Sequence, residues 1–173
     1  DVCNKITDKL IFRHPHIYGE YKANNAQEVS EMWEQVKLKE KGGNKTVLAG
    51  IPESLPALVK AYRIQDKVAN VGFDWEKRED VWAKVKEEIA EFEVEVDHMD
   101  EAKATEEMGD LIFALVNAAR LYNIRPDNAL EKTNAKFIKR FNYIEQKAKE
   151  KGQSLNEMTL DEMEALWQEA KKA

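Results

Sequence analysis

Two pairs of carboxylates recur at helical spacing near the middle of the 173-residue chain. Glu88 and Glu91 are three residues apart, and so are Glu107 and Asp110, so each pair projects from one face of a helix. Two such helices facing each other would gather oxygen ligands without histidine or cysteine, a set that suits Mg²⁺ or Mn²⁺ better than zinc. The spacing therefore predicts a divalent-metal site, although Glu88 and Glu91 alone also fit an ordinary solvated acidic helix.

The second carboxylate pair opens a strongly apolar segment, residues 111–121, and Glu107, Asp110 and Asn117 fall near one line along it. We expect this helix to be buried on most sides. A buried carboxylate without a partner is costly or stays protonated, so both acids need cations nearby. Residues 87–110 hold eleven acids and one base, Lys103, so bound metal ions would supply the missing positive charge.

Basic residues near these pairs could hold phosphate groups whose other oxygens contact the metals. Lys84 and Lys103 each lie four residues before a carboxylate of one pair, and Lys136 and Arg140 are one helical turn apart further along the chain. The alternative is a set of ordinary i, i+4 ion pairs, each worth a few tenths of a kcal/mol. Spacing alone leaves both interpretations open.

Two further groups carry weaker signals. His14 and His16 flank a proline at a predicted helix end, where a structural role is more common than metal binding. Phe73 and Trp75 could stack on a base, but aromatic residues in a short connector more often pack into a small cluster. We therefore interpret all four as structural.

Helical periodicity runs through nearly the whole chain, and no segment alternates as a strand does. Helices are expected over residues 1–13, 25–41, 54–71, 77–96, 100–122, 127–150 and 159–171. Gly72 and Gly152 stand where helices end, and the spacing of Thr159 and Glu162 matches a capping box that opens the last helix. The predicted fold class is all-α, a helical bundle.

The composition excludes several classes of protein. With 43% hydrophobic and 35% charged residues the chain can build a core, while 7 Gly and 4 Pro are too few for a β-sandwich. The net charge of −6 argues against a nucleic-acid binder, and no apolar run approaches the roughly 18 residues that span a membrane. The lone Cys3 cannot form an internal disulfide, which fits a cytoplasmic protein.

The chain also repeats itself, because residues 1–17 match residues 128–144 at an offset of 127. The identical pairs are Lys5 and Lys132, Lys9 and Lys136, Ile11 and Ile138, Arg13 and Arg140, and Ile17 and Ile144. The sequence begins inside a helical pattern without an initiator Met. We therefore expect the tail of a first repeat followed by a complete second repeat, which alone carries the acidic block.

The arrangement Glu87-Glu88-x-x-Glu91 followed by Glu107-x-x-Asp110 resembles the signature of the all-α nucleoside triphosphate pyrophosphohydrolases. Within them the chain is similar to the MazG family over essentially its whole length. The stretches that carry this similarity are residues 13–16 (RHPH), 51–58 (IPESLPAL), 69–75 (ANVGFDW) and 106–111 (EEMGDL). MazG proteins carry two tandem repeats, in agreement with the internal similarity.

The resemblance implies roles for individual residues. Positions that match the Mg²⁺ ligands are Glu88, Glu91, Glu107 and Asp110, and with Glu87 they make up the implied catalytic set. Positions that match the nucleotide site are Lys84, Glu87, Glu88, Lys103, Glu106, Asp110, Lys136, Arg140 and Trp167. The implied reaction is attack of water on the α-phosphorus, with Glu87 or Glu91 accepting its proton.

We therefore expect a cytoplasmic, homodimeric, Mg²⁺-dependent enzyme, with Mn²⁺ as an alternative metal. It would convert nucleoside triphosphates of any base, ribo or deoxy, to the monophosphate and pyrophosphate, with no nucleic-acid or membrane partner. Residues 1–45 would be the remnant of the first repeat with an interdomain helix, and residues 46–173 the catalytic domain. The alternative is a catalytically silent helical module that binds a partner protein through its acidic face.

Overall fold

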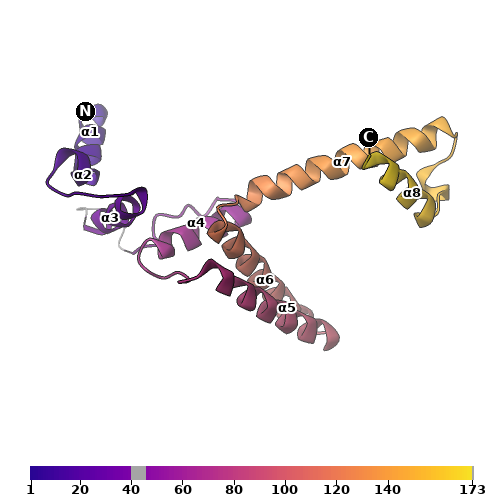
Figure 1. Ribbon diagram of the computed structural model, residues 1–173, viewed down its shortest axis with the longest axis horizontal. Helices are drawn as coiled ribbons and strands as arrows, with labels where there is room; N and C mark the ends of the chain where they lie inside the picture. The colour runs from indigo at the N-terminus through magenta and orange to yellow at the C-terminus, as the bar shows by residue number, and fades with distance from the viewer. Residues whose placement is uncertain (40–45, 173) are drawn as a thin grey trace. The chain divides into compact units, whose positions relative to one another are not determined.

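The computed structural model describes residues 1–39 and 46–172, and within these ranges it contains helices and no strand (Figure 1). The α-helices are α1 (Val2–Arg13), α2 (Pro15–Tyr18), α3 (Ala26–Lys39), α4 (Ala57–Ala69), α5 (Val81–Asp97), α6 (Glu101–Leu121), α7 (Pro126–Glu150) and α8 (Leu160–Ala170). Two short 3₁₀ helices, η1 (Arg78–Asp80) and η2 (Leu155–Glu157), precede α5 and α8. The all-α prediction is confirmed.

Two helix starts differ from the prediction. The helix expected from residue 54 begins at Ala57, because Pro56 is its N-cap residue with an extended ψ of 143°. The helix expected from residue 77 begins at Val81, because η1 occupies the preceding turn. The predicted end of the second helix, residues 40–41, lies outside the described residues.

The predicted helix ends and caps agree more closely with the structure. Gly72 and Gly152 follow α4 and α7 with φ angles of +91° and +66°, values that favour glycine. The Thr159 N–H donates to Glu162 at 2.8 Å and the Glu162 N–H donates to the Thr159 hydroxyl at 3.3 Å, which confirms the capping box. Ser154 forms a second capping box at η2 that the sequence analysis did not identify.

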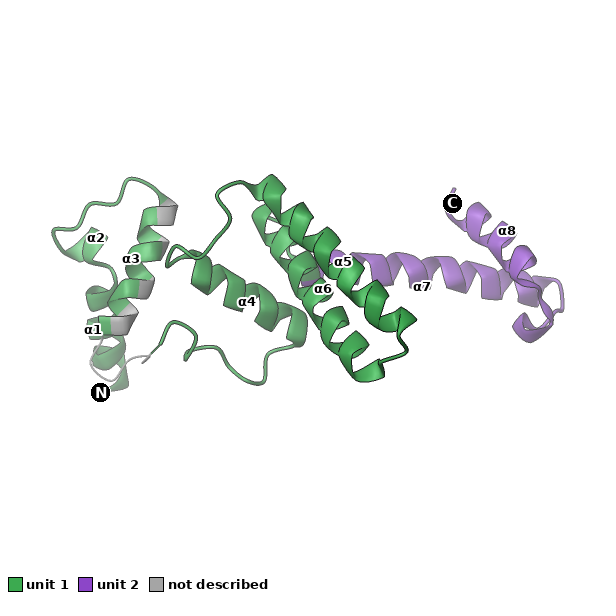
Figure 2. Ribbon diagram, turned by 90° about the horizontal axis from the view of Figure 1, so that it is seen from below, with its two compact units in different colours: residues 1–126 green, residues 127–173 purple. Residues whose placement is uncertain are grey.

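The chain divides into two compact units, Asp1–Pro126 and Asp127–Ala173 (Figure 2). The second unit buries Ile144, Ala148, Met158 and Leu166 where α7 and α8 meet. The predicted boundary between residues 45 and 46 is a different division, based on sequence repeats, and stays a prediction. None of the described helices is long and apolar enough to cross a membrane.

The centre of the first unit is an antiparallel hairpin of α5 and α6 (Figure 1). Val81 and Val85 on α5 pack against Ala114 and Ala118 on α6, and the small alanine side chains let the two backbones approach closely. Helix α4 packs against α6 as well. The hairpin therefore fixes which residues of α5 and α6 face each other.

Helix α6 is less buried than its apolar sequence predicts. Ile112, Phe113 and Leu115 are 43%, 40% and 45% exposed, so the expectation of burial on most sides is wrong. The reason is geometric, because α5 and α4 cover only part of the helix surface. Asp110 is exposed and Glu107 is half-buried. The buried carboxylate of this region is Glu88, which lies on α5.

Candidate functional site

The helical hairpin brings carboxylates from α5 and α6 to one point. One ligand oxygen from each of Glu88, Glu107 and Asp110 lies within 4.8 Å of the other two, and Glu88 is only 5% exposed. Glu91, one turn further along α5, is exposed and lies outside this cluster of three. Among the described residues, His14 and His16 belong to no such cluster.

Lys84 and Lys103, which were predicted to lie near the carboxylate pairs, contact different acids. Lys84 Nζ lies 2.7 Å from an oxygen of Glu87 and 2.7 Å from an oxygen of Glu88. These hydrogen bonds, that to Glu87 first, raise the pKa of the Lys84 ammonium well above its usual range. Lys103 Nζ instead lies 3.8 Å from oxygens of Glu95 and Asp100.

The Glu107 carboxyl lies among other acidic groups, and its pKa reflects this. Partial desolvation, and then the negative charges of Glu91, Asp110, Glu88 and Glu95, raise its pKa. Among the side chains that the structure describes, no lysine or arginine lies within ion-pair distance of Glu107 or Asp110. The two carboxylates on α6 thus have no cationic partner in this part of the chain, and a divalent ion would supply one.

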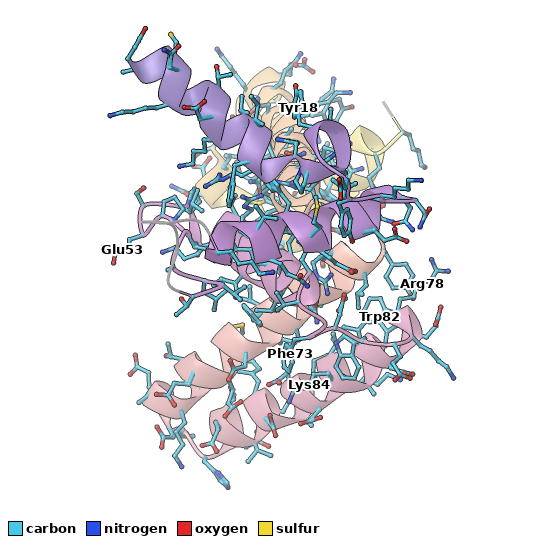
Figure 3. The ribbon with its side chains drawn as sticks, turned by 90° about the vertical axis from the view of Figure 1, so that its left-hand side faces the viewer. Tyr18, Glu53, Phe73, Arg78, Trp82 and Lys84 are labelled. Carbon is cyan, nitrogen blue, oxygen red and sulfur yellow. The ribbon has the colours of Figure 1, made fainter. Side chains whose placement is uncertain are left out.

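A cavity of about 730 Å³ opens beside the cluster, and Lys84, Glu88 and Asp110 form part of its wall. The connector between α4 and η1 supplies Phe73 and Trp75 to another part of the wall. Phe73 is 79% exposed and Trp75 is 40% exposed, so their interpretation as a small packed cluster is wrong. In Figure 3, Phe73 and Lys84 are labelled among the side chains of this region. The volume is suitable for a small organic ligand.

A bidentate ion pair holds the aromatic connector against α6. The Arg120 guanidinium donates through both terminal nitrogens to the two carboxylate oxygens of Asp74, one of these bonds being 2.9 Å long. Arg120 also donates to Asn117 Oδ1 from Nε at 3.2 Å and from Nη2 at 2.9 Å. Sequence analysis missed Asp74 and Arg120, because residues 46 positions apart carry no periodic signal.

The remaining predicted residues lie on other parts of the two units. Glu106 is exposed on α6. In the second unit, Lys136 is exposed, and the Arg140 guanidinium carbon lies 5.4 Å from the centre of the Trp167 ring. Phe137 packs against the same ring, and the two ring centres are 5.0 Å apart. Within the second unit, Arg140 and Trp167 thus share one aromatic cluster.

Carboxylates clustered from facing helices of an all-helical fold are typical of proteins that hold divalent cations. Comparison with known proteins shows which family of this class the chain resembles. Residues 76–144 match the model of the MazG nucleotide pyrophosphohydrolase domain. This range contains the whole α5–α6 hairpin.

Curated relatives cover almost the whole chain. It is 43% identical to the nucleoside triphosphate pyrophosphohydrolase of Escherichia coli strain K12, over 99% of this chain and 67% of that protein. It is 37% identical to the Thermotoga maritima nucleoside triphosphate pyrophosphohydrolase/pyrophosphatase MazG, over 99% of this chain and 65% of that protein. The uncharacterized protein YabN of Bacillus subtilis is 47% identical over 99% of this chain and 36% of its own length. The chain belongs to the MazG family of nucleotide pyrophosphohydrolases.

Proposed function

We propose that this chain hydrolyses nucleoside triphosphates to nucleoside monophosphates and pyrophosphate, without strong preference among the bases. The observation that carries the proposal is the convergence of Glu88, Glu107 and Asp110 within 4.8 Å, in a chain of the MazG family. The lone cysteine, Cys3, is a free thiol, which fits our placement of the activity in the cytoplasm.

The carboxylates fit a hard divalent cation. We assign Glu88, Glu91, Glu107 and Asp110 as ligands of Mg²⁺ or Mn²⁺, because all four offer oxygen donors and their charges crowd around Glu107. When bound, such an ion neutralises phosphate charge and makes a bound water more acidic. Of these four residues, the buried Glu88 is held in place before any ion binds, because Lys84 pairs with it at 2.7 Å.

The chain's own side chains would do the rest of the chemistry. Lys84 lines the cavity and carries a charge that its two glutamate partners stabilise, so it is suited to hold a phosphate oxygen. Glu87 and Glu91 flank Glu88 on α5 and are exposed. We propose that one of these two glutamates accepts the proton that is released when water attacks the α-phosphorus.

We assign the remaining nucleotide-site residues from the family resemblance alone. They are Lys103, Glu106, Lys136, Arg140 and Trp167. Two features of the second unit agree with this assignment, the exposure of Lys136 and the contact of Arg140 with Trp167. We also propose a homodimer, with residues 46–173 as the catalytic domain.

Product analysis tests the proposed reaction. The purified chain is incubated with ATP, GTP, CTP and UTP and with Mg²⁺, and the products are separated by ion-exchange chromatography. We expect the monophosphate and pyrophosphate in equal amounts from every substrate. Formation of ADP and orthophosphate from ATP would contradict the proposed chemistry. The Glu107→Gln variant serves as the control for contaminating phosphatases.

A silent acidic docking module is the alternative function, and the exposed acids Glu87, Glu91 and Glu106 would form its docking face. Glu88 does not fit that role, because it is 5% exposed and paired with Lys84. Binding of nucleotide without any turnover would favour the docking interpretation. A rise in melting temperature that needs both Mg²⁺ and nucleotide would favour the enzyme.

A further inference from the structure

The cavity beside the carboxylates has a part of its wall that phosphate and metal chemistry does not use. This part combines aromatic and aliphatic side chains with two amides, those of Gln65 on α4 and Asn117 on α6. Apolar walls with a few fixed polar groups are typical of sites that recognise the organic part of a ligand. The orientation of both amides can be worked out from their partners.

The Asn117 amide is oriented by Arg120. A guanidinium group only donates hydrogen bonds, and it donates two of them to Asn117 Oδ1. The oxygen of Asn117 must therefore face Arg120, and the Nδ2 group is left as a donor. No acceptor among the described residues is within hydrogen-bond distance of Nδ2. Because Asp74 holds Arg120 in turn, this donor is fixed before a ligand arrives.

The Gln65 amide has the opposite arrangement. Gln65 is 4% exposed, and its Nε2 donates to the Phe113 carbonyl oxygen at 2.8 Å. A carbonyl only accepts, so the side-chain oxygen of Gln65 must lie on the other side. This Oε1 atom is buried and has no hydrogen-bond partner in the described part of the chain. Unpaired buried acceptors are rare in folded proteins, and here the unpaired group belongs to a residue that lines a cavity.

The position of these amides relative to the carboxylates fits a nucleotide. Asn117 lies seven residues after Asp110 on the same helix, which is roughly 10 Å along the helix axis at a rise of about 1.5 Å per residue. Phosphates bound near Asp110 and Glu88 through a divalent ion would therefore place the sugar between the two sites. The base would then reach the part of the cavity where Asn117, Gln65, Phe73 and Trp75 lie.

We propose that this part of the cavity binds the nucleobase, with Asn117 Nδ2 donating to a ring nitrogen or carbonyl oxygen and Gln65 Oε1 accepting from an amino or imino group. Phe73 and Trp75 supply apolar contact to the ring. This assignment rests on the proposed function for the identity of the ligand. Each common nucleobase carries a donor next to an acceptor, so one donor and one acceptor recognise a base without selecting a single one.

The Asn117→Asp variant tests the contribution of the Nδ2 donor by itself. An aspartate has nearly the same shape and still accepts both hydrogen bonds from Arg120, so only the Nδ2 donor is removed. Its added negative charge weakens binding of any triphosphate, and comparison with a ligand that has no base corrects for this. Asn128→Asp adds the same charge at an exposed position outside the cavity and is the matched control.

Calorimetric binding with Mg²⁺ present tests the proposal without requiring turnover. The ligands are α,β-methylene ATP, which resists cleavage at the scissile bond, and inorganic tripolyphosphate, which has no base. For the unmodified chain and for Asn128→Asp we expect the nucleotide to bind at least about tenfold more tightly than tripolyphosphate. Asn117→Asp should reduce this preference by about tenfold.

Phe73→Ala provides a second measurement. Because Phe73 is 79% exposed, its truncation leaves the core unchanged, and we expect the same loss of preference for the nucleotide. Equal binding of the two ligands by the unmodified chain, or a preference unchanged in both variants, overturns the proposal. A chain that shows the expected binding but never cleaves ATP disproves the proposed function and leaves the base site standing.

Discussion

The Lys84 ammonium nitrogen lies 2.7 Å from a carboxylate oxygen of Glu88, which is one turn away on α5 and almost fully buried. A buried carboxylate is costly without a partner, and Lys84 provides that partner from a position that is itself 40% exposed. The same lysine lines the cavity beside the carboxylate cluster. Its structural role and its proposed contact with phosphate therefore depend on one side chain.

Replacing Lys84 by methionine should destabilise the metal-free protein. The change leaves Glu88 buried without its cation, and we expect a loss of about 1–2 kcal/mol, less than for a fully buried pair because solvent screens Lys84. Urea unfolding with EDTA at pH 7 measures it. Lys147→Met is the matched control, since Lys147 lies 2.7 Å from an exposed carboxylate, Glu150. Equal effects of the two substitutions would contradict the role given to Glu88 burial.

The stability of the metal-free protein should depend on pH through Glu107. Its pKa is raised in the folded state, so folding favours the protonated form, and this contribution is lost as the pH rises through the raised value. Glu107→Gln removes the charge permanently. We therefore expect the variant to melt at a higher temperature than the unmodified chain at pH 7, and the difference to shrink toward pH 4. A constant difference across this range would argue against repulsion as the cause.

Loss of one metal ligand should abolish activity without unfolding the chain. Asp110→Asn and Glu107→Gln each remove a charged oxygen donor from the cluster, and we expect turnover to fall by more than about 100-fold. Glu101→Gln removes the same charge from an exposed position in the first turn of α6 and should leave turnover nearly unchanged. Activity is measured by pyrophosphate release over a Mg²⁺ titration, and wild-type values for Asp110→Asn would show that the site is not catalytic.

The carboxylate cluster was predictable because its members follow the period of a helix. Glu88 sits on α5, while Glu107 and Asp110 sit one turn apart on α6, so spacing alone placed the latter two on one face. That α5 and α6 pair as a hairpin follows from the short connector between them. The contact of Lys84 with Glu88 follows from the same i, i+4 rule, and the structure confirms it.

The other residues that line the cavity could not be predicted in this way. Asp74 meets Arg120 across 46 residues, and Gln65 meets Phe113 across 48. Such pairs depend on how α4 and the connector pack on α6, which no local pattern records. The same limit explains the error on α6 burial, because an apolar sequence does not say which of its faces the rest of the chain covers.

The repeated segments allow a test of which cations act in catalysis. Arg13 ends α1, and Arg140 holds the equivalent place in the second copy, where its guanidinium contacts the Trp167 ring. Arg140 follows the α5–α6 hairpin that carries the carboxylate cluster, so we expect it to act on a metal-bound triphosphate, where a lost charge-assisted contact costs on the order of 2–4 kcal/mol. We expect Arg140→Ala to lower turnover at saturating Mg²⁺ by at least about tenfold and Arg13→Ala to leave it within about twofold. Equal losses in the two purified variants would mean that α1 contributes to the active site, and the assignment of a single catalytic repeat would be wrong.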